Sequence, residues 1–221
     1  MLVFGFDAGL AATSAEDFVS RLLARQIGAA GVVTGDDFTF GHGRGGNVDV
    51  LKRLGLKVGI GAEAVAPVLI DGERISSGRI REALAAGDPS TATRLLSRPF
   101  AVEGLVERGD QRGRELGYPT ANLGLGDYQR PAYGIYAARV RLDDQREFAA
   151  VASLGVRPTF QPPVELLEAH LFDFNEDLYG RTIEVALHAF IRPEEKFADV
   201  GALVARMRSD EAEARRLLAI A

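Results

Sequence analysis

The sequence predicts two domains of different class: an α/β domain with a parallel sheet, followed by a mainly β domain that ends in a helix. Up to about residue 87, helical and strand patterns alternate, which is typical of parallel α/β sheets. After Pro89, strand patterns follow one another at close spacing, which indicates a β-barrel or sandwich. We place the domain boundary near residues 87–99, where the texture changes.

The first half opens with an amphipathic helical pattern at residues 14–28. Ser14 can cap this helix and Gly28 can end it. The apolar run at residues 31–35 predicts a short buried strand. This helix and strand are the first repeat of the α/β pattern.

The second repeat begins at Asn47, which we expect to cap a helix that closes at Gly55. We expect a strand at residues 56–60, and the apolar run at residues 64–70 predicts another. A doubly wound nucleotide-binding domain needs more strands than these, so the sequence resembles only part of one.

The second half begins with a helix capped by Asp88, with Pro89 in its first turn. The last strand pattern alternates, so Ile183, Val185, Leu187 and Ala189 are expected on one face. The strand patterns lie at residues 100–107, 133–142, 148–154, 166–174 and 182–190. A final helix is expected at about residues 199–219.

Composition excludes several classes of function. The 221 residues carry a formal net charge of −5, so no basic excess points to a nucleic-acid partner. The chain has no cysteine, which excludes disulfides, thiolate metal sites and a cysteine nucleophile. No apolar run reaches the roughly 18 residues that span a bilayer, and the amino terminus does not read as a signal peptide. We therefore expect a cytoplasmic protein with no membrane partner; the sequence does not indicate its oligomeric state.

The segment from residue 109 to residue 122 carries the strongest chemical signal. Its glycines let the backbone approach an anion, and its arginines can hold phosphate oxygens. A hydroxyl and an amide oxygen follow, and these are hard ligands suited to Mg²⁺. From the residues alone, a surface turn with solvated arginines is an equal alternative. The candidate phosphate-binding residues are Gly109, Arg112, Gly113, Arg114, Gly117, Thr120 and Asn122, and the candidate metal ligands are Thr120 and Asn122.

The run GDQRGRELGYPTAN closely resembles the signature of the riboflavin kinase domain. The resemblance continues through the second half in order, at residues 133–136, 155–160, 168–171, 177–180 and 192–197. It implies a six-stranded antiparallel barrel with a carboxyl-terminal helix over residues 98–221. It also implies an activity: transfer of the γ-phosphate of ATP to the ribityl 5′-hydroxyl of riboflavin, giving FMN.

The resemblance assigns roles to single residues. Glu168 matches the family's catalytic base, although from the residues alone it reads as a solvated strand residue. Thr120 and Asn122 match the residues that bind Mg²⁺ and nucleotide phosphates, and the glycine-rich loop would close over ATP. Ser153 departs from the family pattern, where asparagine is common, and we do not expect this change to abolish activity.

Residues 1–90 resemble the latter part of the FMN adenylyltransferase domain that often precedes this kinase and makes FAD. Residues 34–41 match, and residues 74–81 resemble its phosphate motif at a helix start. Gly78 replaces the usual threonine, and no histidine stands in an HxGH motif. We therefore expect a partial domain without useful adenylyltransferase activity. Its remaining phosphate-motif residues are Ser76, Ser77, Arg79 and Arg81.

Other interpretations stay open. The chain is alternatively a fragment of a bifunctional FAD synthetase that also adenylylates FMN, or a non-catalytic flavin- or nucleotide-binding module. The presence together of Glu168, Thr120 and Asn122 argues against a module that only binds, because binding needs no base. Residues 41–46 satisfy G-x-G-x-x-G but lack the preceding strand and the ribose-binding acid, and no Walker motif is present.

Overall fold

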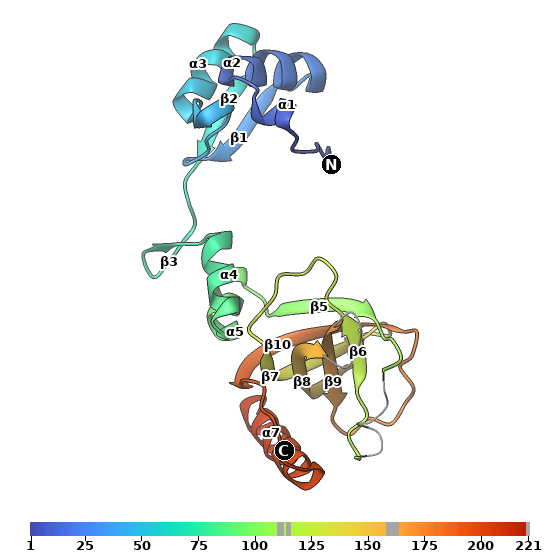
Figure 1. The fold of residues 1–221 in the computed structure, drawn as a ribbon. Helices are drawn as coiled ribbons and strands as arrows, with labels where there is room; N and C mark the ends of the chain where they lie inside the picture. Colours follow the sequence, from blue (N-terminus) through green and yellow to red (C-terminus); the bar gives the residue numbers. More distant parts are fainter. Residues whose placement is uncertain (110–112, 114–115, 158–163, 220–221) are drawn as a thin grey trace. The chain divides into compact units, whose positions relative to one another are not determined.

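A computed structural model describes residues 1–109, 113, 116–157 and 164–219. The chain forms two compact units, Met1–Ile75 and Ser76–Ala221 (Figure 1). The first unit is of α/β class, and the second is a six-stranded antiparallel sheet with a carboxyl-terminal helix. Both classes are as the sequence predicts.

A two-stranded parallel sheet forms the centre of the first unit. Strands β1 and β2 pair in register from Gly31 opposite Gly61 onward. Helices cover one face of this sheet and build a small core around Val19 and Leu51. Its elements are α1 (Ala8–Ala11), α2 (Ala15–Asp17), the π-helix η1 (Phe18–Ile27), β1 (Gly31–Gly35), η2 (His42–Arg44), α3 (Val48–Val58), β2 (Gly61–Val65), β3 (Leu69–Ile70) and β4 (Glu73–Arg74).

Helix α3 differs from its prediction. Asn47 caps it as expected, accepting a hydrogen bond from the backbone of Val50 at 3.0 Å. The helix does not stop at Gly55, so the predicted strand at residues 56–60 is wrong. Gly55 is needed inside the helix because a Cβ there would lie 2.6 Å from the carbonyl oxygen of Ile60. Gly59, with φ of 78°, ends the helix in the left-handed region instead.

Helices α4 (Ser77–Ala85) and α5 (Pro89–Leu96) belong to the second unit. Asp88 caps α5 as predicted, accepting from the backbone of Thr91 at 2.9 Å. The carbonyl of Leu84 accepts a hydrogen bond from the backbone of Ala132 at 2.8 Å. This helical pair therefore packs against the barrel.

The six strands follow the order β5-β10-β7-β8-β9-β6. The two edge strands meet where the backbone N–H of Glu107 donates to the carbonyl of Asn122 at 2.9 Å, which nearly closes the barrel. The short strand β6 was not expected from the sequence pattern. The strands are β5 (Phe100–Leu105), β6 (Ala121–Gly124), β7 (Gly134–Leu142), β8 (Glu147–Arg157), β9 (Val164–Leu171) and β10 (Thr182–Arg192).

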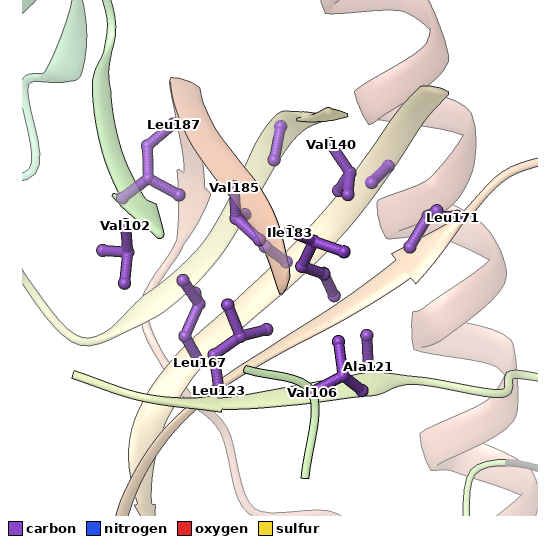
Figure 2. Packing of buried hydrophobic residues seen from close by; sticks show 14 of the residues in the cluster. Val102, Val106, Ala121, Leu123, Val140, Leu167, Leu171, Ile183, Val185 and Leu187 are labelled. Carbon is purple, nitrogen blue, oxygen red and sulfur yellow. The ribbon is translucent and has the colours of Figure 1, made fainter. Parts of the chain in front are cut away.

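Aliphatic side chains from all six strands fill the barrel interior (Figure 2). On β10, Ile183, Val185 and Leu187 face this core, as predicted. The expected place of Ala189 is wrong, because a bulge between Leu187 and Ala189 shifts the alternation. Ala189 therefore lies on the outer face, and Phe190 packs against the barrel core instead.

Helix α7 (Val200–Leu217) lies along the outer face of the barrel (Figure 1). Asp199 caps it, accepting from the backbone of Ala202 at 2.8 Å. Ala214 and Leu218 pack against Ala137 and Phe172 of the sheet. Within the described ranges, no helix is long and apolar enough to cross a membrane.

Candidate active site

A row of five residues crosses the outer face of the barrel at one register. Each is paired directly with its neighbour on the next strand, because β6, β9, β8, β7 and β10 are hydrogen-bonded side by side. The row reads Asn122, Glu168, Ser153, Ile135 and Arg192. Directly paired residues in antiparallel strands have Cβ atoms about 5 Å apart. Residues far apart in the sequence are thereby collected on one surface.

A cavity of about 440 Å³ lies over this row, and all five residues line it. Its volume is in the range of small-molecule sites. Leu203, Met207 and Asp210 of α7 supply the facing wall, and Phe197 adds an aromatic ring. The first cavity, as we call it, thus combines apolar side chains of α7 and Phe197 with a floor in which four of the five residues of the row are polar.

Glu168 is the carboxylate at the centre of the row, between Asn122 and Ser153. Its side chain is partly buried and forms an ion pair with Arg157 at the end of β8. Both residues line the first cavity. A carboxylate has two oxygens, so one can stay with Arg157 while the other accepts a proton from a bound hydroxyl.

Thr120 and Asn122 also line a second cavity of about 470 Å³. The two cavities therefore share these residues as a common wall. Asn122 is buried, with 6% of the residue exposed. Its amide nitrogen lies 3.4 Å from the carbonyl oxygen of Thr120, to which it donates, so the amide oxygen is the atom it could offer to a cation. The outer wall of the second cavity is the segment from Phe174 to Tyr179.

Tyr118 and His170 line the first cavity beside this common wall. Their rings lie 4.9 Å apart. Burial raises the pKa of Tyr118, and the carboxylate of Glu211 on α7 raises it further. The phenol therefore stays neutral and connects the segment before β6 with α7.

A buried ion pair connects β10 with α7 at the other end of the row. Arg192 donates to Asp210 from Nε at 2.9 Å and from Nη2 at 2.6 Å. The hydrogen bonds to Asp210 raise the pKa of Arg192, against the cost of burial. The guanidinium also donates to the carbonyl of Pro193 at 3.0 Å and lies over the ring of Phe197. This pair fixes α7 above the first cavity.

Exposed charges hold the outer wall of the second cavity. Arg146 donates to both oxygens of Glu176 at 2.6 and 2.8 Å, and to Asp144 as well. Arg181 joins the same network through Asp143 and Asp144. Hydrogen bonds from Arg146 lower the pKa of Asp144 and Glu176. The hydrogen bonds from Arg146 to Glu176 thus connect the outer wall of the second cavity with the turn between β7 and β8.

Comparison with known proteins decides the family. A riboflavin kinase family model matches residues 96–218, and a FAD synthetase model matches residues 1–79. The bifunctional riboflavin kinase/FMN adenylyltransferase of Pseudomonas fluorescens is 41% identical over 220 residues, which cover 99% of this chain and 70% of that protein. The chain belongs to the bifunctional riboflavin kinase/FMN adenylyltransferase family. The enzyme of Escherichia coli strain K12 is 38% identical and is also covered to 70%.

A solved structure agrees with this membership at the level of fold. A protein from Streptococcus pneumoniae, described as a macrolide-efflux protein, has a TM-score of 0.80 and 35% identity over 95% of this chain and 67% of that one. Membership in the riboflavin kinase/FMN adenylyltransferase family confirms the resemblance found in the sequence. The second unit carries a riboflavin kinase domain, and the riboflavin kinase family uses ATP and riboflavin in making FMN and FAD.

The structure brings together part of the predicted kinase site. Glu168, Thr120 and Asn122 line one cavity, and Gly113 lines it too. Gly109 lies against the amide of Asn122, where a Cβ would be 2.8 Å from Nδ2. Gly117 adopts a φ of 84°. Arg112 and Arg114 lie outside the described residues.

The predicted adenylyltransferase residues gather at the start of α4. The hydroxyl of Ser76 caps the helix, accepting from the backbone of Arg79 at 3.3 Å. Ser77 is the first helical residue, and Arg81 is exposed one turn on. The structure thus places these residues at one helix start, and their role at a phosphate stays a prediction; none of them lines either kinase cavity.

Sequence reasoning missed several residues of the first cavity. Arg157 and Arg192 stand in stretches that resemble the family, so that resemblance was the available signal. His170 stands in another such stretch. Asp210 had none, since it lies in a charged run of a helix and reads as a solvated residue.

Proposed function

We propose that the second unit phosphorylates riboflavin with Glu168 as general base and with Thr120 and Asn122 at the phosphates and Mg²⁺ of ATP. The observation that carries this proposal is the wall common to the two cavities. It holds Thr120 and Asn122, and Glu168 is paired directly with Asn122 across β6 and β9. A donor and an acceptor in adjoining cavities would therefore meet at these residues.

We assign riboflavin to the first cavity and ATP to the second. The first cavity has an apolar wall on α7, which suits the flat isoalloxazine ring, and it contains the carboxylate that the ribityl hydroxyl needs. The second cavity includes Phe174 and Tyr179, aromatic side chains against which an adenine ring can stack. This assignment directs the γ-phosphate toward Glu168.

The proposed chemistry is a direct transfer. As the 5′-hydroxyl oxygen attacks the γ-phosphorus, its proton passes to the Glu168 carboxylate, and ADP leaves with the electrons of the broken P–O bond. The positioning of the two substrates supplies much of the catalysis in such a transfer. Arg157, ion-paired with Glu168, orients the carboxylate for this step.

The residues present fit Mg²⁺. The described parts of the chain hold no group of three or more histidine, cysteine or acidic side chains suited to a metal. Mg²⁺ is commonly bound by few protein ligands together with substrate phosphates and water, and the Thr120 hydroxyl and Asn122 amide oxygen suit that mode. When bound, Mg²⁺ would neutralise developing charge on the phosphates.

We propose a functional division at residues 98–221 for the kinase and residues 1–90 for a partial FMN adenylyltransferase-like domain. The packing of α4 and α5 against the barrel supports treating both helices as a connection that moves with the kinase unit. A chain that begins at Ser76 is therefore the conservative choice for isolating kinase activity.

Replacement of the carboxylate tests the assignment of the base. Glu168→Gln keeps the shape and removes the proton acceptor, so kcat for FMN formation should fall by about 10²–10⁴-fold, while ATP binding persists. Glu165→Gln is the matched control, because Glu165 lies on the same strand but outside both cavities. Near wild-type turnover in Glu168→Gln would remove Glu168 from the role of base.

A further inference from the structure

We infer that His170 is a positioning residue of the kinase, which holds the carbonyl of Pro119 and so fixes Thr120 in the wall between the two cavities. This inference rests on the proposed role of Thr120 at the phosphates and Mg²⁺. His170 lies on the first-cavity side of the wall, whereas Pro119 lines the second cavity. The hydrogen bond between them therefore connects a residue of the first cavity with a residue of the second.

The contact defines the state of the imidazole. Nδ1 of His170 lies 2.8 Å from the carbonyl oxygen of Pro119. A carbonyl oxygen only accepts, so Nδ1 carries the hydrogen and donates it. The hydrogen bond therefore specifies both the ring orientation and the tautomer.

The backbone explains why this segment needs a side-chain donor. The β6 ladder begins at Ala121, opposite Ala169 of β9. Thr120 and Pro119 precede the ladder, so no rung between β6 and β9 pairs their backbone, and the Pro119 carbonyl accepts from the His170 side chain instead. His170 follows Ala169, the β9 residue of this terminal pair. Its side chain donates to the backbone where a further ladder hydrogen bond would lie if the ladder continued. Thr120 is thereby tied to the sheet one residue before the sheet itself would hold it.

The imidazole itself packs beside two aromatic rings. Its centroid lies 4.9 Å from the Tyr118 ring and 6.1 Å from the Phe172 ring. The Arg215 guanidinium of α7 covers Phe172 at 4.5 Å. A side chain packed in this way offers its donor at a fixed position, which is what a positioning residue must do.

Two substitutions separate the donor from the ring. His170→Asn keeps an N–H one bond beyond Cγ, where Nδ1 stands, and loses the ring. His170→Phe keeps the ring and loses the donor. FMN formation is measured while MgATP, free Mg²⁺ and riboflavin are varied in turn, and thermal unfolding of each variant is recorded. His188→Phe is the control, because His188 is a half-buried histidine of β10 outside both cavities.

We expect His170→Phe to raise KM for MgATP and the Mg²⁺ concentration for half-maximal rate by about tenfold, the effect of losing one hydrogen bond. KM for riboflavin should stay near the wild-type value. His170→Asn should restore most of the MgATP affinity, although it melts earlier than His170→Phe. His188→Phe should match the wild type in all kinetic constants. The two His170 variants should thus rank in opposite order for MgATP affinity and for thermal stability. A purely structural role would give the same order in both measurements.

Three results would overturn the inference. If His170→Phe keeps wild-type MgATP and Mg²⁺ dependence, the hydrogen bond positions nothing. If both His170 variants lose the same affinity, the ring matters and the donor does not. If Thr120→Ala leaves Mg²⁺ dependence unchanged, the proposed role of Thr120 fails, and the inference falls with it. The first two outcomes count against His170 alone if the wild-type protein forms FMN and Thr120→Ala raises the Mg²⁺ requirement as proposed. The role of Thr120 would then stand without His170.

Discussion

The ion pair between Arg192 and Asp210 offers a test of what fixes α7 to the barrel. The two side chains are 8% and 6% exposed, and two short hydrogen bonds join them. Asp210→Leu leaves the guanidinium buried with the Pro193 carbonyl, the Phe197 ring and the Glu195 carboxylate at 3.6 Å as its remaining contacts among the described residues. Breaking a buried pair in this way costs roughly 3–5 kcal/mol. Because Glu195 partly compensates, we expect the lower end of that range.

The reciprocal change, Arg192→Met, leaves Asp210 with Arg206 at 3.7 Å as its nearest remaining cation. It should also destabilise the unit. The double variant Arg192→Met/Asp210→Leu removes both buried charges and fills the space with apolar groups, an exchange that is often neutral or stabilising. We therefore expect the double variant to be more stable than either single variant.

Urea unfolding followed by tyrosine fluorescence measures these free energies in the second unit alone. The chain has no tryptophan, and all 5 tyrosines, from Tyr118 to Tyr179, lie in that unit. A double variant that loses the sum of the two single losses would refute the coupling, and so would a single variant that loses under about 1 kcal/mol, the scale of an exposed pair. Either result would mean that apolar packing alone holds α7.

Three further predictions concern the site and helix α5. Thr120→Ala and Asn122→Ala should each raise the Mg²⁺ concentration needed for half-maximal FMN formation, and an unchanged requirement in both would exclude the pair as metal ligands. Gly113→Ala should raise KM for riboflavin, because Gly113 lines the first cavity and its Cβ would lie 2.3 Å from the backbone carbonyl oxygen of Tyr118; an unchanged KM would show that the backbone there accommodates the methyl group. Asp88→Ala should destabilise the second unit by about 1 kcal/mol at neutral pH through loss of the α5 cap. Hydrogen bonds from Thr91 lower the pKa of Asp88 in the folded state. This contribution is therefore present above the unfolded-state pKa of about 3.9 and lost as pH falls through the folded value, so the difference between wild type and Asp88→Ala should shrink below about pH 4.

Local signals in the sequence predicted the elements that local chemistry determines. The caps at Asn47 and Asp88 depend on side chains that bond within three residues, and both formed as expected. The sequence predicts too short a helix α3 because Gly55 reads as a stop. Glycine is needed there because the Ile60 carbonyl lies close, and that contact exists only in the folded chain. The bulge that moves Ala189 to the outer face is likewise set by pairing with β7.

The candidate site likewise contains residues that the sequence indicates and residues that only the packing of distant elements brings in. The role of Glu168 follows from the family resemblance alone. For Thr120 and Asn122, the residues themselves leave a phosphate and Mg²⁺ site and a surface turn as equal alternatives, and the resemblance favours the site. Asp210 was missed because its partner Arg192 lies on another element, and the pairing depends on how α7 sits on the sheet. The hydrogen bond from His170 to Pro119 joins residues 51 positions apart and depends on the β6–β9 register.

The single register that brings Asn122, Glu168 and Arg192 into one row also makes activity a sensor of correct assembly. A slip of one residue in β9 would turn Glu168 into the apolar interior and Leu167 or Ala169 toward the substrate. A barrel in a shifted register would thus be compact yet inactive. The rate at which refolding chains regain FMN synthesis therefore reports strand alignment, whereas circular dichroism reports only that strands have formed. Length changes should accordingly be confined to the hairpin turns, where they leave the row in place.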